Sequence, residues 1–488
     1  MTHNNENPKY DVKYCDNKMK FEDCEMAILR HAIDENEENI NQSLIKSDNI
    51  QKIITILEDF LIKKKLICYG GTAINNILPK NAQFYNRNIE IPDYDFFSPN
   101  AMEDAIELSN IYYNEGYDEV ETKAGIHIGT YKVFVNFIPV ADITFMHNSL
   151  FEKLLNEVIT VAGIKYAPPN FLRMSMYLEL SRPRGDISRW EKVFKRLNIL
   201  NKFYPLKYNN CNDFIDKNVE NPNYKNIIEH IRNSFIEQNV VFIGGFAFQL
   251  YNKLKKNEDD ADNDKNIYPL NVDVLSETPE KCAMILTERL KDNGFNAFSI
   301  HHPSFGEIIP EHYEIQVNKK SVAYIYKTIG CHNYNTITLN GKDINVATID
   351  TMLSFYLAFI YSNEYEKQRE RILCMAQDLF NIQKYFRLSR KGLLKRFTMN
   401  CIGKQPTMED IRHEKNELFK KLYSKKGTIQ YDMYFLNYRP DKPFLKTKYN
   451  KKYFNNQTQK NKTNMTKIFK KKKTYRRNNY RKKKGYLF

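Results

Sequence analysis

Two segments of the chain follow one pattern, and this repeat is the feature that most restricts the possible folds. Residues 65–78, KLICYGGTAINNIL, resemble residues 240–254, VVFIGGFAFQLYNKL. Each has an apolar run, Gly-Gly, one further residue, alanine and then a helical pattern. The similarity continues, because IPDYDFFSPNAMEDAIEL (91–108) matches PLNVDVLSETPEKCAMIL (269–286). Later segments match in the same order, which indicates an internal duplication.

Each repeat alternates strand-like and helix-like segments and then adds a strand pair. This order predicts a duplicated α/β (α+β) fold, with helices packed on a sheet in each copy. The predicted division is an N-terminal segment, partly disordered (1–46), a first fold unit (47–205), a second fold unit (225–365), a helical extension (366–440) and a basic disordered tail (441–488).

The positive charge of the chain is concentrated at its C-terminal end. Residues 441–488 hold 18 Lys and Arg against one acidic residue, Asp441. The whole chain has 74 Lys and Arg and 59 Asp and Glu, so the rest holds 56 basic and 58 acidic residues and is almost neutral. Basic residues interleaved with Tyr and Phe predict a flexible RNA-binding tail. A localisation signal or a solubilising tail is the alternative.

Eight cysteines are spread along the chain without a Cys-x-x-Cys pair or a Cys/His cluster at zinc spacing. We therefore predict reduced, mostly buried thiols in an intracellular protein, and no zinc site. The polar N-terminus lacks the apolar core of a signal peptide. The longest apolar stretch, 351–362, is shorter than the roughly 20 residues that a membrane span requires. The sequence thus predicts a soluble protein with no membrane partner.

Gly70, Gly71 and Thr72 follow the first apolar strand and open a helical pattern, with the helix expected to start near Thr72. Glycine permits close approach of a ligand to the backbone, and a helix N-terminus attracts anions. These residues therefore could cradle a triphosphate. A simple Gly-Gly turn between a strand and a helix is the alternative interpretation.

Three carboxylates are predicted to lie on neighbouring strands. Asp93 and Asp95 are two residues apart, so on one strand their side chains point the same way. Asp142 interrupts a mostly apolar segment, VNFIPVADITFM (135–146), where an acid needs a partner. Two divalent cations roughly 3.5–4 Å apart would neutralise such a group and activate an attacking hydroxyl. A structural salt bridge is the alternative for Asp142.

In combination, Gly70-Gly71, Asp93-Tyr-Asp95 and Asp142 resemble the polymerase β-type nucleotidyltransferases. YGGTAIN, IPDYDFFS, VADITFM and YAPPNFLRMSMYLELSRPRGDISRWEKVFKRL resemble, more narrowly, the poly(A) polymerase catalytic subunits of large DNA viruses such as mimivirus-like giant viruses. This resemblance covers residues 60–200. It implies a template-independent enzyme that adds adenylate from ATP to RNA 3′ ends.

The resemblance also implies roles for individual residues. Asp93, Asp95 and Asp142 would hold two Mg²⁺ or Mn²⁺ ions, and Asp142 would bind the ion that activates the primer 3′-hydroxyl. Gly70, Gly71 and Thr72 would bind the triphosphate. The gap between Gly71 and Asp93 is longer than in most cellular relatives, which leaves the phosphate contacts of Lys80 and Arg87 open.

The second repeat lacks most of this carboxylate set. Its alignment places Asn271 opposite Asp93, Asp273 opposite Asp95 and Tyr324 opposite Asp142. We therefore predict an active first copy and a degenerate second copy that helps to hold RNA.

Several other residues near the third carboxylate are open to two interpretations. Phosphate contacts are conceivable for a group of basic residues, although a structural or solvated charge is favoured for each: Arg173, Arg182, Arg184, Lys192 and Arg196. For Trp190, the only tryptophan, core packing is favoured over base stacking.

Two other functions remain open at the level of sequence. One is a nucleotidyltransferase with another acceptor, such as a tRNA 3′ end or a protein side chain. The other is a non-catalytic RNA-binding scaffold. The expected partners are ATP and a single-stranded RNA 3′ end, and the resemblance leaves open a homodimer or a separate processivity partner. The expected location is the host cytoplasm, at the viral factory, and also the virion.

Overall fold

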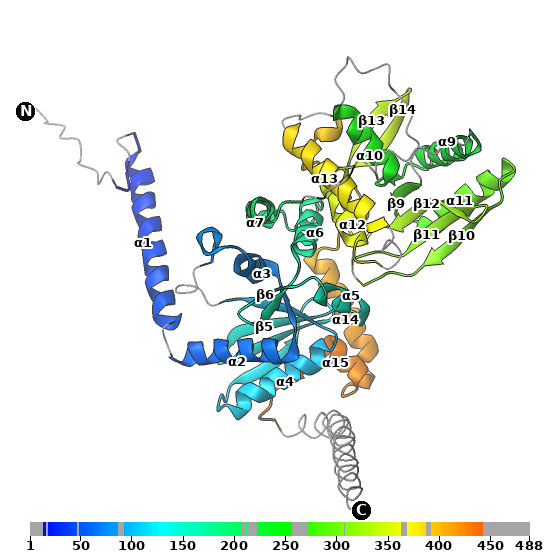
Figure 1. Cartoon of the computed structure of the whole chain (residues 1–488). Helices are drawn as coiled ribbons and strands as arrows, with labels where there is room; N and C mark the ends of the chain where they lie inside the picture. Colours follow the sequence, from blue (N-terminus) through cyan, green and yellow to red (C-terminus); the bar gives the residue numbers. More distant parts are fainter. Residues whose placement is uncertain are drawn as a thin grey trace, which may run out of the picture.

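The computed structural model describes residues 13–15, 18–45, 48–85, 92–206, 208, 211, 222–255, 271–306, 308–362, 368–386 and 392–442. The predicted basic tail therefore lies outside the described residues, except for Asp441 and Lys442, and so does Arg87. Helix α1 (Phe21–Ile45) projects from the body at the N-terminal end (Figure 1). Within the described residues, no helix is both long and apolar enough to cross a membrane.

The first fold unit is built on an eight-stranded mixed sheet with the strand order β16-β3-β4-β5-β2-β1-β7-β6. Helices α2 (Asp48–Lys64) and α4 (Ala101–Asn114) pack on it, and α2 lies within the predicted helical segment 47–65. The strands are β1 (Ile67–Tyr69), β2 (Tyr94–Ser98), β3 (Val120–Ala124), β4 (Thr130–Val135), β5 (Ile138–Phe145), β6 (Ile159–Val161), β7 (Ile164–Tyr166) and β16 (Asn437–Tyr438).

The second fold unit has its own eight-stranded sheet, in the order β10-β11-β12-β9-β8-β14-β13-β15. Helices α9 (Pro222–Glu237) and α11 (Pro279–Asp292) pack on this sheet. Its strands are β8 (Val241–Phe242), β9 (Val272–Ser276), β10 (Ala297–His302), β11 (His312–Val317), β12 (Lys320–Lys327), β13 (His332–Leu339), β14 (Lys342–Ala347) and β15 (Cys401–Ile402).

The two sheets share one strand order over seven strands, which confirms the predicted duplication. The correspondence extends to register: Cys68 pairs with Phe96 in the first sheet, and Phe242 pairs with Val274 at the equivalent place in the second. Even an irregularity is repeated, because the β4–β5 and β11–β12 ladders shift register at equivalent positions, next to Val133 and Ile315. Such a bulge fixes the local twist of a strand pair.

Helices α6 (Pro169–Leu180) and α12 (Ile349–Phe359) occupy equivalent places in the two units and pack against each other between the sheets (Figure 1). Phe171 and Tyr361 meet edge to face there, with ring centroids 5.6 Å apart. The Asn333 backbone N–H donates to the Ser181 carbonyl at 2.9 Å. The two copies therefore share one continuous apolar core.

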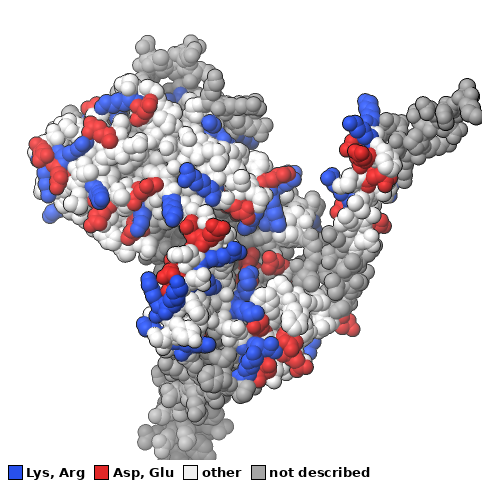
Figure 2. Space-filling view, turned by 180° about the vertical axis from the view of Figure 1, so that it is seen from behind, with Lys and Arg blue, Asp and Glu red and all other residues white. Residues whose placement is uncertain are grey.

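The C-terminal segment is divided between the two copies. Helix α13 (Arg369–Tyr385) packs on α12, and β15 joins the edge of the second sheet beside β13. Helices α14 (Met408–Leu422) and α15 (Ile429–Phe435) then return to the first copy, where β16 pairs with β3. The side-chain charges of the described body are of mixed sign on the face that Figure 2 shows, in keeping with its near-neutral composition.

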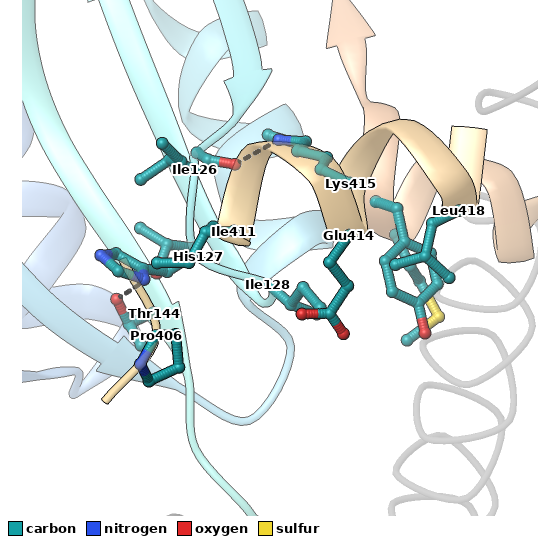
Figure 3. A pocket seen from close by; sticks show the side chains of 14 residues that line it. Ile126, His127, Ile128, Thr144, Pro406, Ile411, Glu414, Lys415 and Leu418 are labelled. Atoms are coloured by element: carbon teal, nitrogen blue, oxygen red, sulfur yellow. Dashed lines mark hydrogen bonds between the residues drawn. The ribbon is translucent and has the colours of Figure 1, made fainter. Parts of the chain in front are cut away.

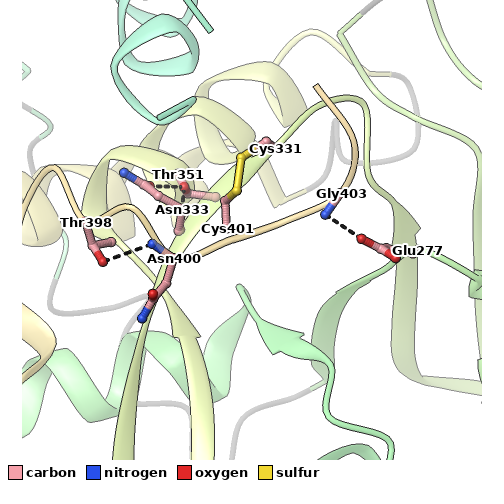
Figure 4. Close-up of a disulfide and its surroundings, with 8 residues drawn as sticks. All are labelled: Glu277, Cys331, Asn333, Thr351, Thr398, Asn400, Cys401 and Gly403. Carbon is pink, nitrogen blue, oxygen red and sulfur yellow. Dashed lines mark hydrogen bonds between the residues drawn. A yellow bond between two sulfur atoms is a disulfide. The ribbon is translucent and has the colours of Figure 1, made fainter. Parts of the chain in front are cut away.

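The prediction that all eight cysteines are reduced thiols is wrong for six of them. The structure pairs Cys15 with Cys24, Cys211 with Cys374, and Cys331 with Cys401 as disulfides. Cys68 and Cys282 are free and buried, as predicted. The Cys211–Cys374 and Cys331–Cys401 pairs were missed because their partners are 163 and 70 residues apart and only the fold brings them together. The Cys331–Cys401 disulfide joins the start of β13 to β15 (Figure 4).

A buried ion pair forms between α12 and the segment that follows α13. The Arg396 guanidinium donates to both Asp350 carboxylate oxygens, at 2.9 Å from Nε and 2.6 Å from Nη2. Asp350 is fully buried. Such a two-fold contact satisfies a carboxylate that the core cannot otherwise hold.

Replacing Arg396 by alanine should lower the free energy of unfolding by about 3–5 kcal/mol, because it leaves the Asp350 charge buried and unpaired. Chemical denaturation followed by circular dichroism measures this change. Arg289→Ala is the matched control, since its ion pair with Glu237 is half exposed and contributes about 1 kcal/mol at most. Equal losses in the two variants would contradict the assignment.

Candidate active site

Neighbouring side chains crowd both positions of the Gly-Gly pair in the turn between β1 and α3 (Gly70–Ile77), and only Gly70 has a positive φ. Gly70 has a φ of +73°, and a Cβ atom there would lie 2.8 Å from Oδ2 of Asp95. A Cβ atom on Gly71 would lie 2.6 Å from the Tyr85 hydroxyl and 2.9 Å from Nη1 of Arg196. The helix begins at Gly70, two residues before the expected start, and the side chains of Asp95, Tyr85 and Arg196 lie against its N-terminus.

Thr72 connects this turn to the carboxylate strand. Its hydroxyl donates to the Asp93 backbone carbonyl at 2.6 Å. Thr72 is itself buried, so its hydroxyl acts here as a positioning group between the turn and β2. The predicted cradle and the predicted carboxylates therefore lie side by side.

The three predicted carboxylates lie on or beside two adjacent strands, β2 and β5, at the centre of the first sheet. Asp95 on β2 and Asp142 on β5 are direct register partners in a parallel pair. Asp93 lies one residue before β2 begins. The intervening Tyr94 donates to Glu58 of α2, so it faces the helical layer. Asp93 and Asp95 consequently point to the opposite, open side of the sheet.

Burial and the neighbouring carboxylates raise the pKa of Asp93 and Asp95. Burial, and after it the charges of Asp93 and Asp142, raises the pKa of Asp95 to about 7. Burial and then the charge of Asp142 also raise the pKa of Asp93. Two neighbouring acids with raised pKa values mark a site that favours positive charge.

Lys132 supplies part of that charge. It lies on β4 directly opposite Asp142, and its Nζ is 2.5 Å from Oδ2 of Asp142. The structure therefore contains the salt bridge that sequence reasoning named as the alternative role for Asp142. Lys132 itself was missed. Its signal is a lysine on the partly exposed face of an alternating strand, but the pairing of β4 with β5 had to be known first.

Within the described residues, no three His, Cys, Asp or Glu side chains are grouped closely enough to hold a metal ion. The donor chemistry nevertheless fits a hard divalent cation, because such ions prefer carboxylate oxygens. The repulsion that raises the pKa of Asp93 and Asp95 would be relieved by a cation between them. Metal binding by Asp93, Asp95 and Asp142 stays a prediction.

Arg196 lies directly over the Gly-Gly turn. It comes from α7 (Trp190–Phe203), donates to the Tyr85 hydroxyl, and stacks on the rings of Phe84 and Tyr85. These contacts hold its guanidinium near Gly71 and the N-terminus of α3. A fixed guanidinium beside a helix N-terminus is suited to phosphate. Of the basic residues considered from sequence, Arg196 is placed best for this role.

The other candidates are placed differently. Arg173 is buried and donates to Asn201 at 2.7 Å, so its role is structural, as favoured from sequence. The Trp190 indole donates to the Glu179 carbonyl and contacts Phe397, which is packing. Among the remaining basic residues, Lys80 and Arg184 are exposed. The charge of Lys192 partly offsets the rise in the pKa of Asp93. Arg182 lies against Gly330, beside the second copy.

Arg189 was not considered from sequence. It forms an ion pair with Glu179 at 3.3 Å. Its positive charge partly offsets the effects that raise the pKa of Asp95. Arg189 and Lys192 flank the start of α7, so this helix brings a basic edge to the carboxylates.

The equivalent place in the second copy has a different chemistry. Tyr324 pairs with Asp273 in parallel register, as Asp142 does with Asp95. Glu314 stands opposite Tyr324, where the first copy has Lys132. Asp273 and Arg371 of α13 line one small cavity there. The second copy therefore puts a guanidinium where the first would need a cation.

A Gly-Gly turn beside carboxylates on adjacent parallel strands, repeated once in degenerate form, defines a duplicated nucleotidyltransferase fold. Residues 55–186 match the family model of the poly(A) polymerase catalytic subunit. This segment, which holds the whole carboxylate set, is therefore similar to that family.

Curated relatives match about a third of the chain. A putative poly(A) polymerase catalytic subunit of African swine fever virus is 36% identical over 164 residues, covering 32% of this chain and 34% of the relative. The one of Acanthamoeba polyphaga mimivirus is 33% identical over 196 residues, covering 38% of this chain and 32% of the relative. The alignments thus span about a third of each relative.

One solved structure matches nearly the whole fold. The crystal structure of the Megavirus polyadenylate synthase superposes with a TM-score of 0.74 and covers 90% of this chain and 92% of that one. Its sequence identity is 19%, so the likeness concerns the fold. It confirms the predicted fold class for both copies together.

Asp273→Ala should leave nucleotide transfer almost unchanged, whereas Asp95→Ala should remove it, because Asn271 and Tyr324 give Asp273 no carboxylate partner. Single-turnover rates of the two variants measure this difference. A lower melting temperature of Asp273→Ala is expected, since Arg371 loses a nearby negative charge. A rate loss as large as that of Asp95→Ala would show that the second copy is catalytic.

Proposed function

We propose that this chain is a polynucleotide adenylyltransferase, which adds adenylate from ATP to RNA 3′ ends without a template. The observation that carries the proposal is the register pairing of Asp95 with Asp142 beside Gly70-Gly71, within the segment that matches the poly(A) polymerase family. The degenerate second copy would serve as a platform for RNA.

The residues of the first copy divide the work. Gly70, Gly71 and Thr72 would hold the triphosphate at the α3 N-terminus, with Arg196 above it. Asp93, Asp95 and Asp142 would hold two Mg²⁺ or Mn²⁺ ions. When bound, such ions activate the attacking 3′-hydroxyl and stabilise the leaving pyrophosphate. Lys132 would keep Asp142 in place before they bind.

Two alternatives are tested by the choice of acceptor. The carboxylate set does not distinguish RNA from a tRNA 3′ end or a protein side chain, because it acts only on a triphosphate and a hydroxyl. Purified protein should be incubated with each acceptor, Mg²⁺ or Mn²⁺, and each nucleoside triphosphate in turn. We expect extension of an RNA primer with ATP. No transfer to any acceptor would favour a non-catalytic scaffold.

Alanine at Asp93, Asp95 or Asp142 should reduce adenylate addition by more than roughly a hundredfold, since loss of even an outer-shell partner of a metal costs 10–100-fold. The fold should persist. The pKa of Asp95 is about 7 in the folded protein and about 4 in the unfolded chain. Its negative charge therefore lowers the free energy of unfolding once the pH rises above about 4. Asp95→Ala should consequently not lower the melting temperature at neutral pH. Near-normal activity in any variant would refute that residue's role.

Arg196→Ala should raise the KM for ATP about tenfold or more, with a smaller effect on the KM for RNA, because a charge-assisted contact to phosphate is lost. Arg196→Lys keeps the charge but not the planar guanidinium, so its KM for ATP should lie between those of the unchanged protein and Arg196→Ala. Steady-state kinetics with each substrate varied gives both constants. Lys195→Ala is the control, since Lys195 is exposed on the same helix and pairs with Glu191. Matching constants for Arg196→Ala and this control would contradict the assignment.

A further inference from the structure

A hollow of about 320 Å³ lies between the first copy and the C-terminal helices (Figure 3). Its walls come from the turn between β3 and β4, from Thr144 on β5, and from α14 and α15. The lining is mostly apolar, with Ile128, Ile411 and Leu418 among its members, and it includes the rings of His127 and Tyr434. Its volume is in the range of small-molecule sites.

The hollow adjoins the carboxylates. Thr144 follows Asp142 by two residues on β5, so both side chains point to the same face, roughly 6.6 Å apart along the strand. The Thr144 hydroxyl is 3.1 Å from that of Thr130, on the turn side, and 3.0 Å from that of Tyr69, which precedes Gly70. Thr144 therefore links the hollow to the side chain of Tyr69, the residue that precedes the Gly-Gly turn.

The strand order places the hollow on the acceptor side of the site. The order β3-β4-β5-β2-β1 puts Gly70-Gly71, which follow β1, on one side of the carboxylates and the hollow, at β3 and β4, on the other. In phosphoryl transfer the attacking and leaving oxygens lie roughly in line. If pyrophosphate leaves toward Gly70-Gly71, the attacking hydroxyl arrives from the side of β4.

The lining suits a base better than a phosphate. The Lys415 ammonium is already engaged, since it donates to the Gly125 carbonyl at 2.7 Å and so ties α14 to the turn. The neighbouring Glu414 adds a carboxylate, which repels phosphate but accepts a hydrogen bond from an exocyclic amino group such as that of adenine. Unpaired bases are commonly bound by stacking on aromatic rings within such surroundings.

We propose that this hollow binds an unpaired base near the 3′ end of the RNA acceptor strand, with Tyr434 and His127 as stacking partners. The proposal rests on the proposed adenylyltransferase activity and assigns acceptor binding to α14 and α15, beyond the segment that matches the family. In this proposal the C-terminal helices that pack on the first copy contact the substrate directly.

The test compares two tyrosines of the same C-terminal unit. Tyr434→Ala should raise the KM for an oligoadenylate acceptor roughly tenfold, the effect of losing one stacked base, while the KM for ATP and the rate at saturating RNA stay unchanged. Tyr423→Ala is the matched control, because Tyr423 is 59% exposed and does not line the hollow. A second variant, Ile411→Trp, should fill the hollow and have the same effect.

Other readouts separate this proposal from the proposed function. RNA carrying thiouridine at its 3′ end should crosslink within 124–130 or 406–434, and fluorescence anisotropy should show weaker RNA binding by Tyr434→Ala, whether or not the protein extends the primer. Failure of extension alone would reject the activity. Equal RNA affinities of the Tyr434 and Tyr423 variants, with crosslinks elsewhere, would overturn the base-binding site. If Tyr434→Ala raised the KM for ATP instead of the KM for RNA, the hollow would be assigned to the nucleotide and the base-binding proposal would be overturned.

Discussion

The pairing of Asp95 with Asp142 across two parallel strands is the constraint on which the rest of the first copy depends. Parallel pairing sets two acids side by side on one face, and their mutual repulsion must be offset locally. The structure does this with Lys132 on the next strand and with the basic start of α7. The Gly-Gly turn is subject to the same constraint, because Asp95 leaves no room for a side chain on Gly70.

The second copy shows what the same fold looks like without that repulsion. One aspartate, Asp273, is retained, and its neighbours are an asparagine, a tyrosine and an arginine. The close contact with glycine persists, since Asp273 also crowds the position of a Cβ on Gly244. Sheet order, register and the bulge have outlasted the carboxylate set. Fold and chemistry are thus separable in this chain, and the comparison is internal to it.

The sequence predicted what depends on local pattern or on repetition. The duplicated fold, helix α2, the positions of the three carboxylates and their replacements in the second copy all follow from spacing and alignment. What it missed depends on pairing between distant segments. Lys132 meets Asp142 only through the β4–β5 register, and Arg196 reaches Gly71 from a helix more than a hundred residues later. The Cys211–Cys374 and Cys331–Cys401 disulfides and the return of the C-terminal segment to the first copy were missed for the same reason.

The path of residues 401–438 has a consequence for how the protein is made. These residues add the edge strand β15 to the second sheet and the edge strand β16 to the first. A ribosome that has not yet released them holds a chain in which β13 and β3 both have an open edge, and open edges invite pairing with other chains. Both sheets are therefore completed only when residues 401–438 have been synthesised. Synthesis from the N-terminus cannot finish the first unit before the second has emerged, so the two halves mature together.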